Sequence, residues 1–221
     1  MLPISRPVLF HTLIVTVLVG LSLFVSYIVP RHARVDADAW LQGLTPKSQA
    51  QLETFAQVQA SDLERARLKD QLALARERAK HHLTVAAYFF SNYYMAIIQA
   101  YVMGAVAAVA LFFITKVGYA QASPNVVTVF ITATVLATIY GTFPSVFRQV
   151  DNVAENKALY LRYIALQNEM LSYSATGLDG SGKKVTAAEY VVSIDKELNK
   201  ANNVAVGFDA TKIPAIKFEL K

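Results

Sequence analysis

Three long stretches of this sequence contain no Asp, Glu, Lys or Arg, and this pattern limits what the chain can fold into. The stretches cover residues 7–30, 81–115 and 126–143. About 20 apolar residues in a helix cross the roughly 30 Å hydrocarbon layer of a bilayer. Hydrophobic residues make up 54% of the chain and charged residues 17%, and the excess is gathered in these stretches. The sequence therefore predicts an all-α integral membrane protein with three transmembrane helices.

The limits of each span follow from its flanking residues. Residues 1–30 are predicted to form an N-terminal transmembrane anchor helix. A cleaved signal peptide is disfavoured because the apolar run is long and Tyr27-Ile28-Val29-Pro30 lacks the small residues of a cleavage site. Residues 95–146 are predicted to form a transmembrane helical hairpin. Its second helix is expected to open at Ser123-Pro124 and to kink or end at Pro144.

Basic residues are divided unequally between the two sides of the predicted spans. The amino terminus and the hairpin loop hold Arg6 and Lys116, whereas the other flanks hold Arg31, Arg34, Arg76, Arg78, Lys80, Arg148, Lys157 and Arg162. The positive-inside rule then predicts a multi-pass protein of an inner, cytoplasmic-type membrane, with its amino terminus outside and its carboxyl terminus in the cytoplasm. The same bias accounts for the net charge of +5, so we predict no nucleic-acid partner.

The polar segments carry helical patterns. Residues 31–94 are predicted to form a linker, with Asp36-Ala37-Asp38 in a loop, and then a long amphipathic helix that starts at Thr45-Pro46 and runs unbroken into the second span. Residues 147–174 are predicted to form a second amphipathic helix. We expect the two helices to extend the hairpin as a cytoplasmic antiparallel coil, and the alternative is two independent surface helices. The residues expected in the coil are Leu68, Leu72, Ala75, Leu159, Tyr163, Leu166 and Met170.

The last segment, residues 175–221, is predicted to be a linker and a small α/β tail domain. Thr186-Ala187-Ala188-Glu189 fits a capping box that opens a short helix ending near Asn202-Asn203. Residues 204–208 and the alternating residues 216–221 are expected to form short strands. Because a two-stranded hairpin alone is marginal, the tail is expected to dock on its own coil or on a neighbouring subunit.

Candidate chemical motifs depart from the patterns that their chemistry requires. The stretch Gly177–Lys183 has the spacing of a phosphate-binding loop, but Lys184 stands where Ser or Thr should hold magnesium, so a linker is the preferred interpretation. The pair His81-His82 cannot chelate one ion from one helix face, because adjacent residues point about 100° apart. The chain has no cysteine. We therefore predict no catalytic residue, no cofactor, no metal site and no enzyme activity.

Small and hydroxylated residues recur at helical spacing within the spans. Such ridges favour helix association in bilayers, because small side chains let two backbones approach closely. The residues predicted to pack helix on helix are Thr12, Thr16 and Gly20 on the first span, Ala100, Gly104 and Ala108 on the second, and Thr128 and Thr132 on the third. They are expected to pack within one subunit or between subunits, and a threonine-lined pore is the alternative.

These features favour a non-enzymatic membrane protein that serves as a homo-oligomeric scaffold or as an accessory subunit of a larger membrane complex. The lipid bilayer and further copies of the chain are the expected partners, bound through the spans and the cytoplasmic helices. A homo-oligomeric channel is the alternative. The hairpin and the helix that follows it, including Asn152–Tyr160, resemble in layout the SLATT group of bacterial two-helix membrane effectors, which implies a pore-forming role. The first span has no counterpart in that layout.

Overall fold

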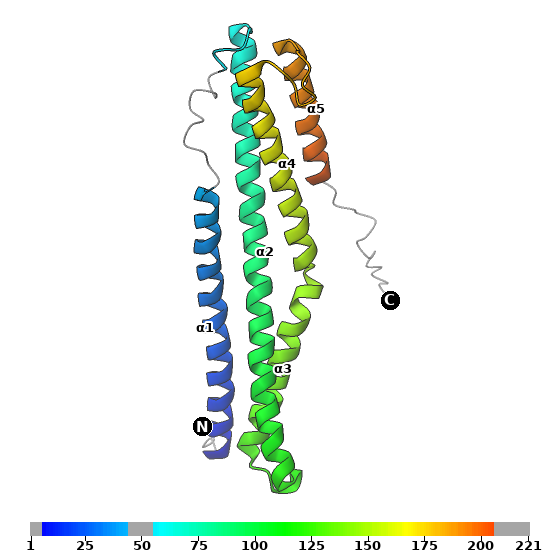
Figure 1. Cartoon of the computed structure of the whole chain (residues 1–221). Coiled ribbons are helices and arrows are strands. Elements are labelled where there is room, and N and C mark those ends of the chain that lie inside the picture. The colour runs from blue at the N-terminus through cyan, green and yellow to red at the C-terminus, as the bar shows by residue number, and fades with distance from the viewer. Residues whose placement is uncertain (1–5, 44–54, 206–221) are drawn as a thin grey trace, which may run out of the picture. The chain divides into compact units, whose positions relative to one another are not determined.

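The computed structural model describes residues 6–43 and 55–205, almost all of them in helices. The helices are α1 (Arg6–Gly43), α2 (Asp62–Val117), α3 (Pro124–Val146), α4 (Gln149–Thr176) and α5 (Ala187–Ala205), with a short 3-10 helix, η2, at Tyr119–Gln121 (Figure 1). The described residues contain no strand, and a single bridge pairs Leu178 with Lys184. Three helical segments, Leu9–Val29, Asp62–Val117 and Pro124–Thr176, each hold a stretch long and apolar enough to cross a membrane. The prediction of three long apolar helices is confirmed.

The chain forms two compact units. The first consists of Met1–Thr45 and Leu83–Lys157, and the second consists of Pro46–His82 and Ala158–Lys221. Both α2 and α4 therefore contribute residues to each unit. The sequence predicts a separate tail domain over residues 175–221, whereas in the structure α5 belongs to the same unit as the start of α2 and the end of α4.

α1 is longer than predicted. The loop expected at Asp36-Ala37-Asp38 is wrong, because the helix continues through Pro30 as far as Gly43. A proline ring removes the N–H that would bond to the carbonyl four residues earlier, here that of Ser26, but the residues after it can still be helical. Residues 31–42 contain neither glycine nor proline, and glycine is a common residue at the end of a helix.

The prediction that the second long helix runs unbroken from Thr45-Pro46 into the second span is wrong, although Thr45-Pro46 itself lies outside the described residues. Residues 44–54 lie outside the described residues, but residues 55–61 are not helical, and Phe55 adopts a left-handed φ of 51°. α2 is capped by Ser61 instead. The Ser61 N–H and hydroxyl donate to Glu64 Oε2 at 2.6 and 2.7 Å, and the Glu64 N–H donates to Ser61 Oγ at 3.3 Å. This reciprocal arrangement is a capping box that the sequence analysis overlooked.

α2 and α3 form the predicted helical hairpin. Gly118, with a φ of 84°, turns the chain after α2, and Pro124 opens α3 directly after Ser123. α3 continues past Pro144 to Val146, so the expected end near this proline is confirmed. Arg148 then breaks the helix with a left-handed φ of 46°.

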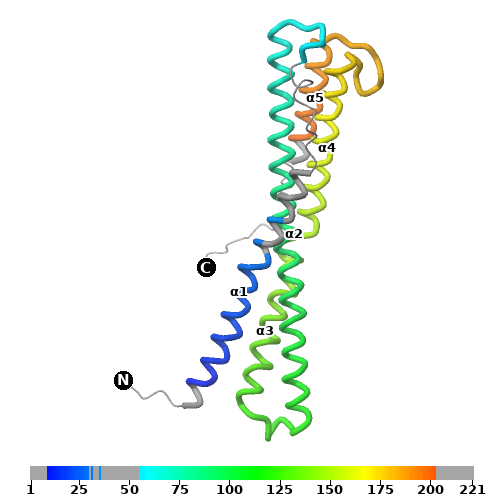
Figure 2. The backbone as a smooth tube through the Cα atoms, turned by 60° about the vertical axis from the view of Figure 1, so that its left-hand side comes forward, coloured from blue at the N-terminus to red at the C-terminus, as the bar shows by residue number. Residues whose placement is uncertain are grey.

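In the second unit α2, α4 and α5 lie side by side in both views (Figures 1 and 2). All seven residues expected in the coil are buried there, namely Leu68, Leu72, Ala75, Leu159, Tyr163, Leu166 and Met170. α5 adds a buried face at steps of three and four, made of Ala187, Tyr190, Ile194, Leu198 and Ala201. The burial of apolar side chains by all three helices makes this unit a small helical core.

Side-chain contacts fix the directions of these helices. His82 of α2 stacks on Tyr163 of α4 with ring centroids 5.6 Å apart, and Gln167 Nε2 donates to the carbonyl of Ala75 at 3.4 Å. Because residue numbers rise along α4 as they fall along α2 in these pairs, the two helices are antiparallel. The broad apolar face of α4 thus has a partner on α2.

α5 docks on the other two helices of its unit. The rings of Tyr173 and Tyr190 stack with centroids 3.7 Å apart, and the Tyr163 hydroxyl donates to Asn202 Oδ1 at 2.8 Å. Further bonds join Gln71 Nε2 to the Val191 carbonyl at 2.9 Å, Arg67 to Asp195 at 2.6 Å, and Arg162 to Glu197 at 3.2 Å. The helical part of the tail therefore docks on its own chain, one of the two arrangements expected.

The capping box predicted for α5 is confirmed. The Thr186 N–H and hydroxyl donate to Glu189 Oε2 at 2.9 and 2.8 Å, and the Glu189 N–H donates to Thr186 Oγ1 at 3.3 Å. The helix runs through Asn202-Asn203 to Ala205, so the strand expected over residues 204–208 is wrong at its start. Residues 206–221, including the strand predicted at 216–221, lie outside the described residues.

Acid should loosen the start of α5. The Thr186 N–H and hydroxyl that bond to the Glu189 carboxylate lower the pKa of Glu189 below its ordinary value. A lowered pKa in the folded state means that the stabilisation is complete above the ordinary pKa of a glutamate and is lost as the pH falls through the lower, folded value. We expect hydrogen exchange at the Tyr190 and Val191 amides, corrected for its intrinsic pH dependence, to accelerate across that range. Glu189→Gln should abolish this acceleration, and a wild-type helix start that is indifferent to acid contradicts the prediction.

Candidate functional site: a polar cluster between three helices

A group of polar side chains joins α1, α2 and α3 inside the first unit. Ser22 and Gln99 are each 1% exposed, although both stand in long uncharged stretches. Ser26 and Tyr140 complete the group, which we call the polar cluster. Burying a polar group without a hydrogen bond costs on the order of several kcal/mol in an apolar environment, so these side chains have to satisfy one another.

The hydrogen bonds of the polar cluster connect α1 to both of its neighbours. Gln99 Nε2 of α2 donates to the Ser22 carbonyl at 2.6 Å and lies 3.4 Å from Ser26 Oγ. The Ser22 hydroxyl donates to the Tyr140 hydroxyl oxygen of α3 at 2.8 Å. Ser26 Oγ lies 3.3 Å from that same oxygen and donates to the Ser22 carbonyl at 2.9 Å, a common bond for serine within a helix. Ser22 is thus the point at which bonds from both neighbouring helices converge.

The polar cluster determines which face of α1 points inward. Ser22 is buried, whereas Gly20 stands two residues away, about 200° around the helix, and is exposed. A Cβ added at Gly20 would meet no atom within 4 Å. Thr12 and Thr16 are exposed as well. The ridge predicted from Thr12, Thr16 and Gly20 is therefore not the face on which α1 packs against the described part of the chain.

The small-residue ridge predicted on α2 likewise does not form the buried face of its helix. Ala100 lies against α3, because a Cβ added at Gly141 would sit 4.0 Å from the Ala100 Cβ. Gly104 has no such neighbour within 4 Å, and Ala108 is exposed. The buried face of this part of α2 is formed instead by Ala96, Gln99, Met103, Ala107, Ala110 and Ile114. A glutamine in the middle of an uncharged stretch is the signal that identifies this face, and the sequence analysis missed it.

The threonines of α3 bond mainly to their own helix. The Thr134, Thr138 and Thr142 hydroxyls donate to the carbonyls of Phe130, Thr134 and Thr138 at 2.8, 2.9 and 3.0 Å. Thr128 donates to the Pro124 carbonyl at 2.9 Å, and its hydroxyl also lies 2.9 Å from His11 Nδ1 of α1. Of the two packing residues predicted on this helix, Thr128 thus meets another helix, and Thr132 is half-buried.

The histidine pair of α2 has a packing role in the second unit. His82 is buried against Tyr163, while His81 is exposed, and their rings are inclined at 74°. The two side chains diverge as expected for neighbours on a helix. Among residues 6–43 and 55–205 no group of three or more His, Cys, Asp or Glu side chains is placed to hold a metal ion.

The loop with the spacing of a phosphate-binding loop is filled by one of its own side chains. Asp179 Oδ1 accepts the N–H of Ser181 at 3.0 Å, the N–H of Lys183 at 2.9 Å and the Ser181 hydroxyl at 2.7 Å. The Ser181 hydroxyl and the Lys183 N–H, with smaller help from the other donors, hold the pKa of Asp179 below its ordinary value. In a phosphate-binding loop the backbone N–H groups point at the phosphate. Because the carboxylate already takes two of them, the geometry favours the linker interpretation.

Comparison of the chain with protein-family models, curated proteins and solved structures finds no match. What the protein does is therefore inferred from its own contacts and surfaces.

Replacing Gln99 by leucine tests the polar cluster. Gln99→Leu keeps a side chain of similar size but removes the bonds to Ser22 and Ser26, so we expect a loss of about 0.6–2 kcal/mol, the range for hydrogen bonds between helices in bilayers. The measurement is reversible unfolding of the full chain in mixed micelles. Thr138→Val is the matched control, since its hydroxyl bonds to its own helix and its removal should cost only about a few tenths of a kcal/mol. Equal losses in the two variants would show that the cluster does not hold the helices together.

Proposed function

We propose that this chain is a multi-pass protein of an inner, cytoplasmic-type membrane that acts, without enzymatic chemistry, as a homo-oligomeric scaffold or as an accessory subunit of a larger membrane complex. Three apolar helical segments of sufficient length support the membrane setting. The charge bias of their flanks favours an amino terminus outside and a carboxyl terminus in the cytoplasm. The bilayer and further copies of the chain are the proposed partners.

The observation that carries this proposal is an outer face of α4 that the rest of the described chain leaves exposed. Ala158, Leu161, Ala165, Asn168 and Ser172 are exposed and recur at alternating steps of three and four residues; we call them the outer α4 stripe. Leu161, the large apolar residue of the stripe, is 53% exposed. Alternating steps of three and four are the spacing of a coiled-coil seam, and a polar residue such as Asn168 within a seam fixes the register of the partner.

The inner face of the same helix is already occupied. Leu159, Tyr163 and Met170 are buried in the core of the second unit, where α2 and α5 pack against α4. The outer α4 stripe therefore faces the opposite way, and its small side chains allow a further helix to approach closely. A second copy of the chain, or a helix of a larger complex, fits this surface.

The apolar helices offer further surfaces for self-association. Gly20 on α1 and Gly104 on α2 belong to small-residue ridges, and an added Cβ at either position would have no neighbour within 4 Å. In a bilayer such ridges support close contact between helices. The space that the described part of one chain leaves beside Gly20 and Gly104 supports contact with a helix of another copy.

Leu161→Arg tests the proposal. A charge placed in the outer α4 stripe should dissociate the assembly, because an arginine in a packed helical seam has no counter-charge. Leu63→Arg is the matched control, since Leu63 is 84% exposed at the start of α2 and lies outside the stripe. The measurement is the mass of the full-length particle, with any copurified protein, in mild detergent and in nanodiscs. The expected result is a fall in mass for Leu161→Arg alone.

Two outcomes of this experiment go against the proposal. A wild-type protein that is a strict monomer and copurifies with no other protein contradicts the scaffold and the accessory roles together. An assembly that survives Leu161→Arg shows that the outer α4 stripe is not the surface that carries it.

A channel is the second candidate function, favoured by one feature of α3. Thr134, Thr138 and Thr142 are exposed and lie four residues apart on one side of the helix, so an oligomer built around that side would line its axis with hydroxyl groups. Conductance of the wild-type assembly in planar bilayers distinguishes the two functions. A conductance that Thr138→Val alters supports a pore, and an intact oligomer that does not conduct supports the scaffold.

A further inference from the structure

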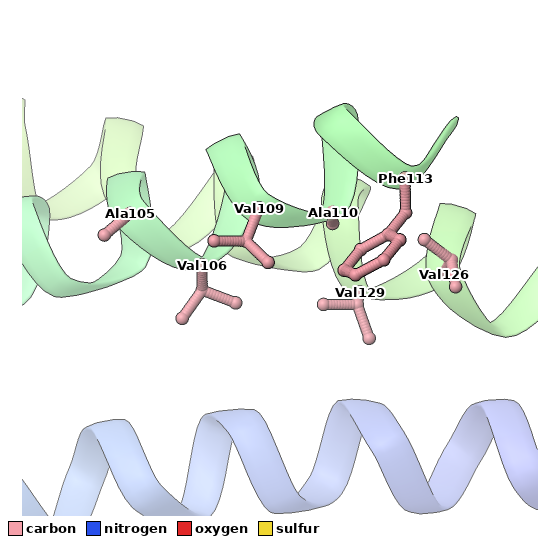
Figure 3. Close-up of a pocket in the computed structure, with 7 residues that line it drawn as sticks. All are labelled: Ala105, Val106, Val109, Ala110, Phe113, Val126 and Val129. Atoms are coloured by element: carbon pink, nitrogen blue, oxygen red, sulfur yellow. The ribbon is translucent and has the colours of Figure 1, made fainter. Parts of the chain in front are cut away.

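An apolar groove of about 400 Å³ lies in the first unit between α2 and α3 on the side that faces α1 (Figure 3). Its walls are made of Ala105, Val106, Val109, Ala110 and Phe113 of α2, with Val126 and Val129 of α3. Figure 3 shows the Val106, Val109 and Val129 side chains pointing toward α1, which crosses the open side. Such a volume is within the range of small-molecule sites in proteins.

Along α2 the groove begins after Gln99, the residue that bonds α2 to α1. Figure 2 shows α1 diverging from α2 toward the amino-terminal end of α1. The bonds from Gln99 to α1 lie at Ser22 and Ser26. At the level of the groove, α1 is bonded to α3 instead, through His11 and Thr128. The three helices are thus joined at the polar cluster and, beside the groove, by this second bond between α1 and α3.

The side chains that line the groove determine which class of molecule can bind in it. All seven side chains are hydrocarbon, so a water molecule there would find none of the polar partners that hold buried water. The groove lies within the apolar segment of α2 and extends over the eight helical steps from Ala105 to Phe113, or about 12 Å at 1.5 Å per residue. One leaflet of a bilayer supplies about half of the 30 Å hydrocarbon layer. The groove is therefore nearly as long as one leaflet is deep.

We propose that this groove seats one acyl chain of a lipid from the leaflet next to the α2–α3 loop. The inference rests on the proposed membrane-spanning state of the three helices. In that state, the open side of the groove faces the hydrocarbon layer, where lipid chains are the abundant apolar molecules. The bound chain packs on the walls that α2 and α3 present toward α1.

Photolabelling tests the proposal. The full chain is reconstituted in phosphatidylcholine vesicles that contain a small fraction of phosphatidylcholine with a diazirine on one acyl chain, and labelled residues are mapped by peptide mass spectrometry. We expect Val106, Val109 and Phe113 to carry several-fold more label than Ile131 and Val135. These last two are residues of α3 outside the groove that are as exposed, at 55% and 52%, as Val109 and Phe113, at 58% and 53%.

Two tryptophan variants provide the matched comparison. Val109→Trp fills the groove and should lower labelling of Val106 and Phe113 several-fold, whereas Val135→Trp makes the same change at a similarly exposed site, 52% against 58%, and should not. Both variants are checked for wild-type helix content and melting temperature. If Val109→Trp does not fold, Ala105→Leu serves as the second groove-filling variant.

The outcomes separate this inference from the proposed function. Even labelling of all exposed apolar residues, or unchanged labelling in Val109→Trp, overturns the acyl-chain site while the membrane-spanning state stands. A second outcome is that the groove residues of the wild type carry no label and that Val109→Trp breaks the assembly into monomers. This result assigns the groove to a helix of a second copy and also overturns the acyl-chain site. A chain that does not float with the vesicles and takes up no label refutes the membrane-spanning state itself.

Discussion

The absence of charged side chains from three long helical stretches is the constraint on which the other features of this protein depend. A helix satisfies its own backbone hydrogen bonds, which allows it to lie in an apolar solvent. Lipid chains are about as apolar as leucine, so apolar burial gives such helices little reason to associate, and packing and hydrogen bonds between them decide how they do. The bonds that Gln99 and Tyr140 make to Ser22 and Ser26 are contacts of this kind, as is the bond between His11 and Thr128. They explain why α1 presents Ser22 rather than Gly20 to its neighbours.

The second unit is held together by the opposite physical effect. There α2, α4 and α5 bury apolar faces such as Leu72, Met170 and Ile194, and charged side chains remain at the surface in pairs such as Arg67 with Asp195. Burial of apolar area away from water is the main driving force in such a core. A single helix, α2, meets both conditions: its composition changes from amphipathic to uncharged along its length. The exposed outer stripe of α4 contains no charged residue, whereas the exposed faces of α2 and α5 include Asp70, Glu77 and Lys196.

Sequence patterns predicted the second unit better than the first. The spacing of Leu68, Leu72, Tyr163 and Met170 identified the buried faces because in water the apolar side of a helix has to be covered. The same reasoning does not apply to the uncharged helices of the first unit, where a small-residue ridge marks where another helix is able to approach, not where one does. Thr12, Thr16 and Gly20 show this. Two helix limits were predicted wrongly for local reasons. Pro30 removes one hydrogen bond without ending α1. Ser61 and Glu64 form the capping box that opens α2, whereas the prediction relied on the helix-start pattern of Thr45-Pro46.

The central claim is that the three apolar helices cross a bilayer and leave both larger polar segments on its cytoplasmic side. Because the chain contains no cysteine, single cysteines can be introduced and their labelling by a membrane-impermeant thiol reagent compared in intact and opened cells. The exposed positions Leu63, Tyr119 and Val192 suit this purpose. Leu63→Cys and Val192→Cys should react only after the cells are opened, and Tyr119→Cys, in the α2–α3 loop, should react in intact cells. Labelling of Leu63→Cys and Val192→Cys from opposite sides, or of all three from the same side, would contradict the claim.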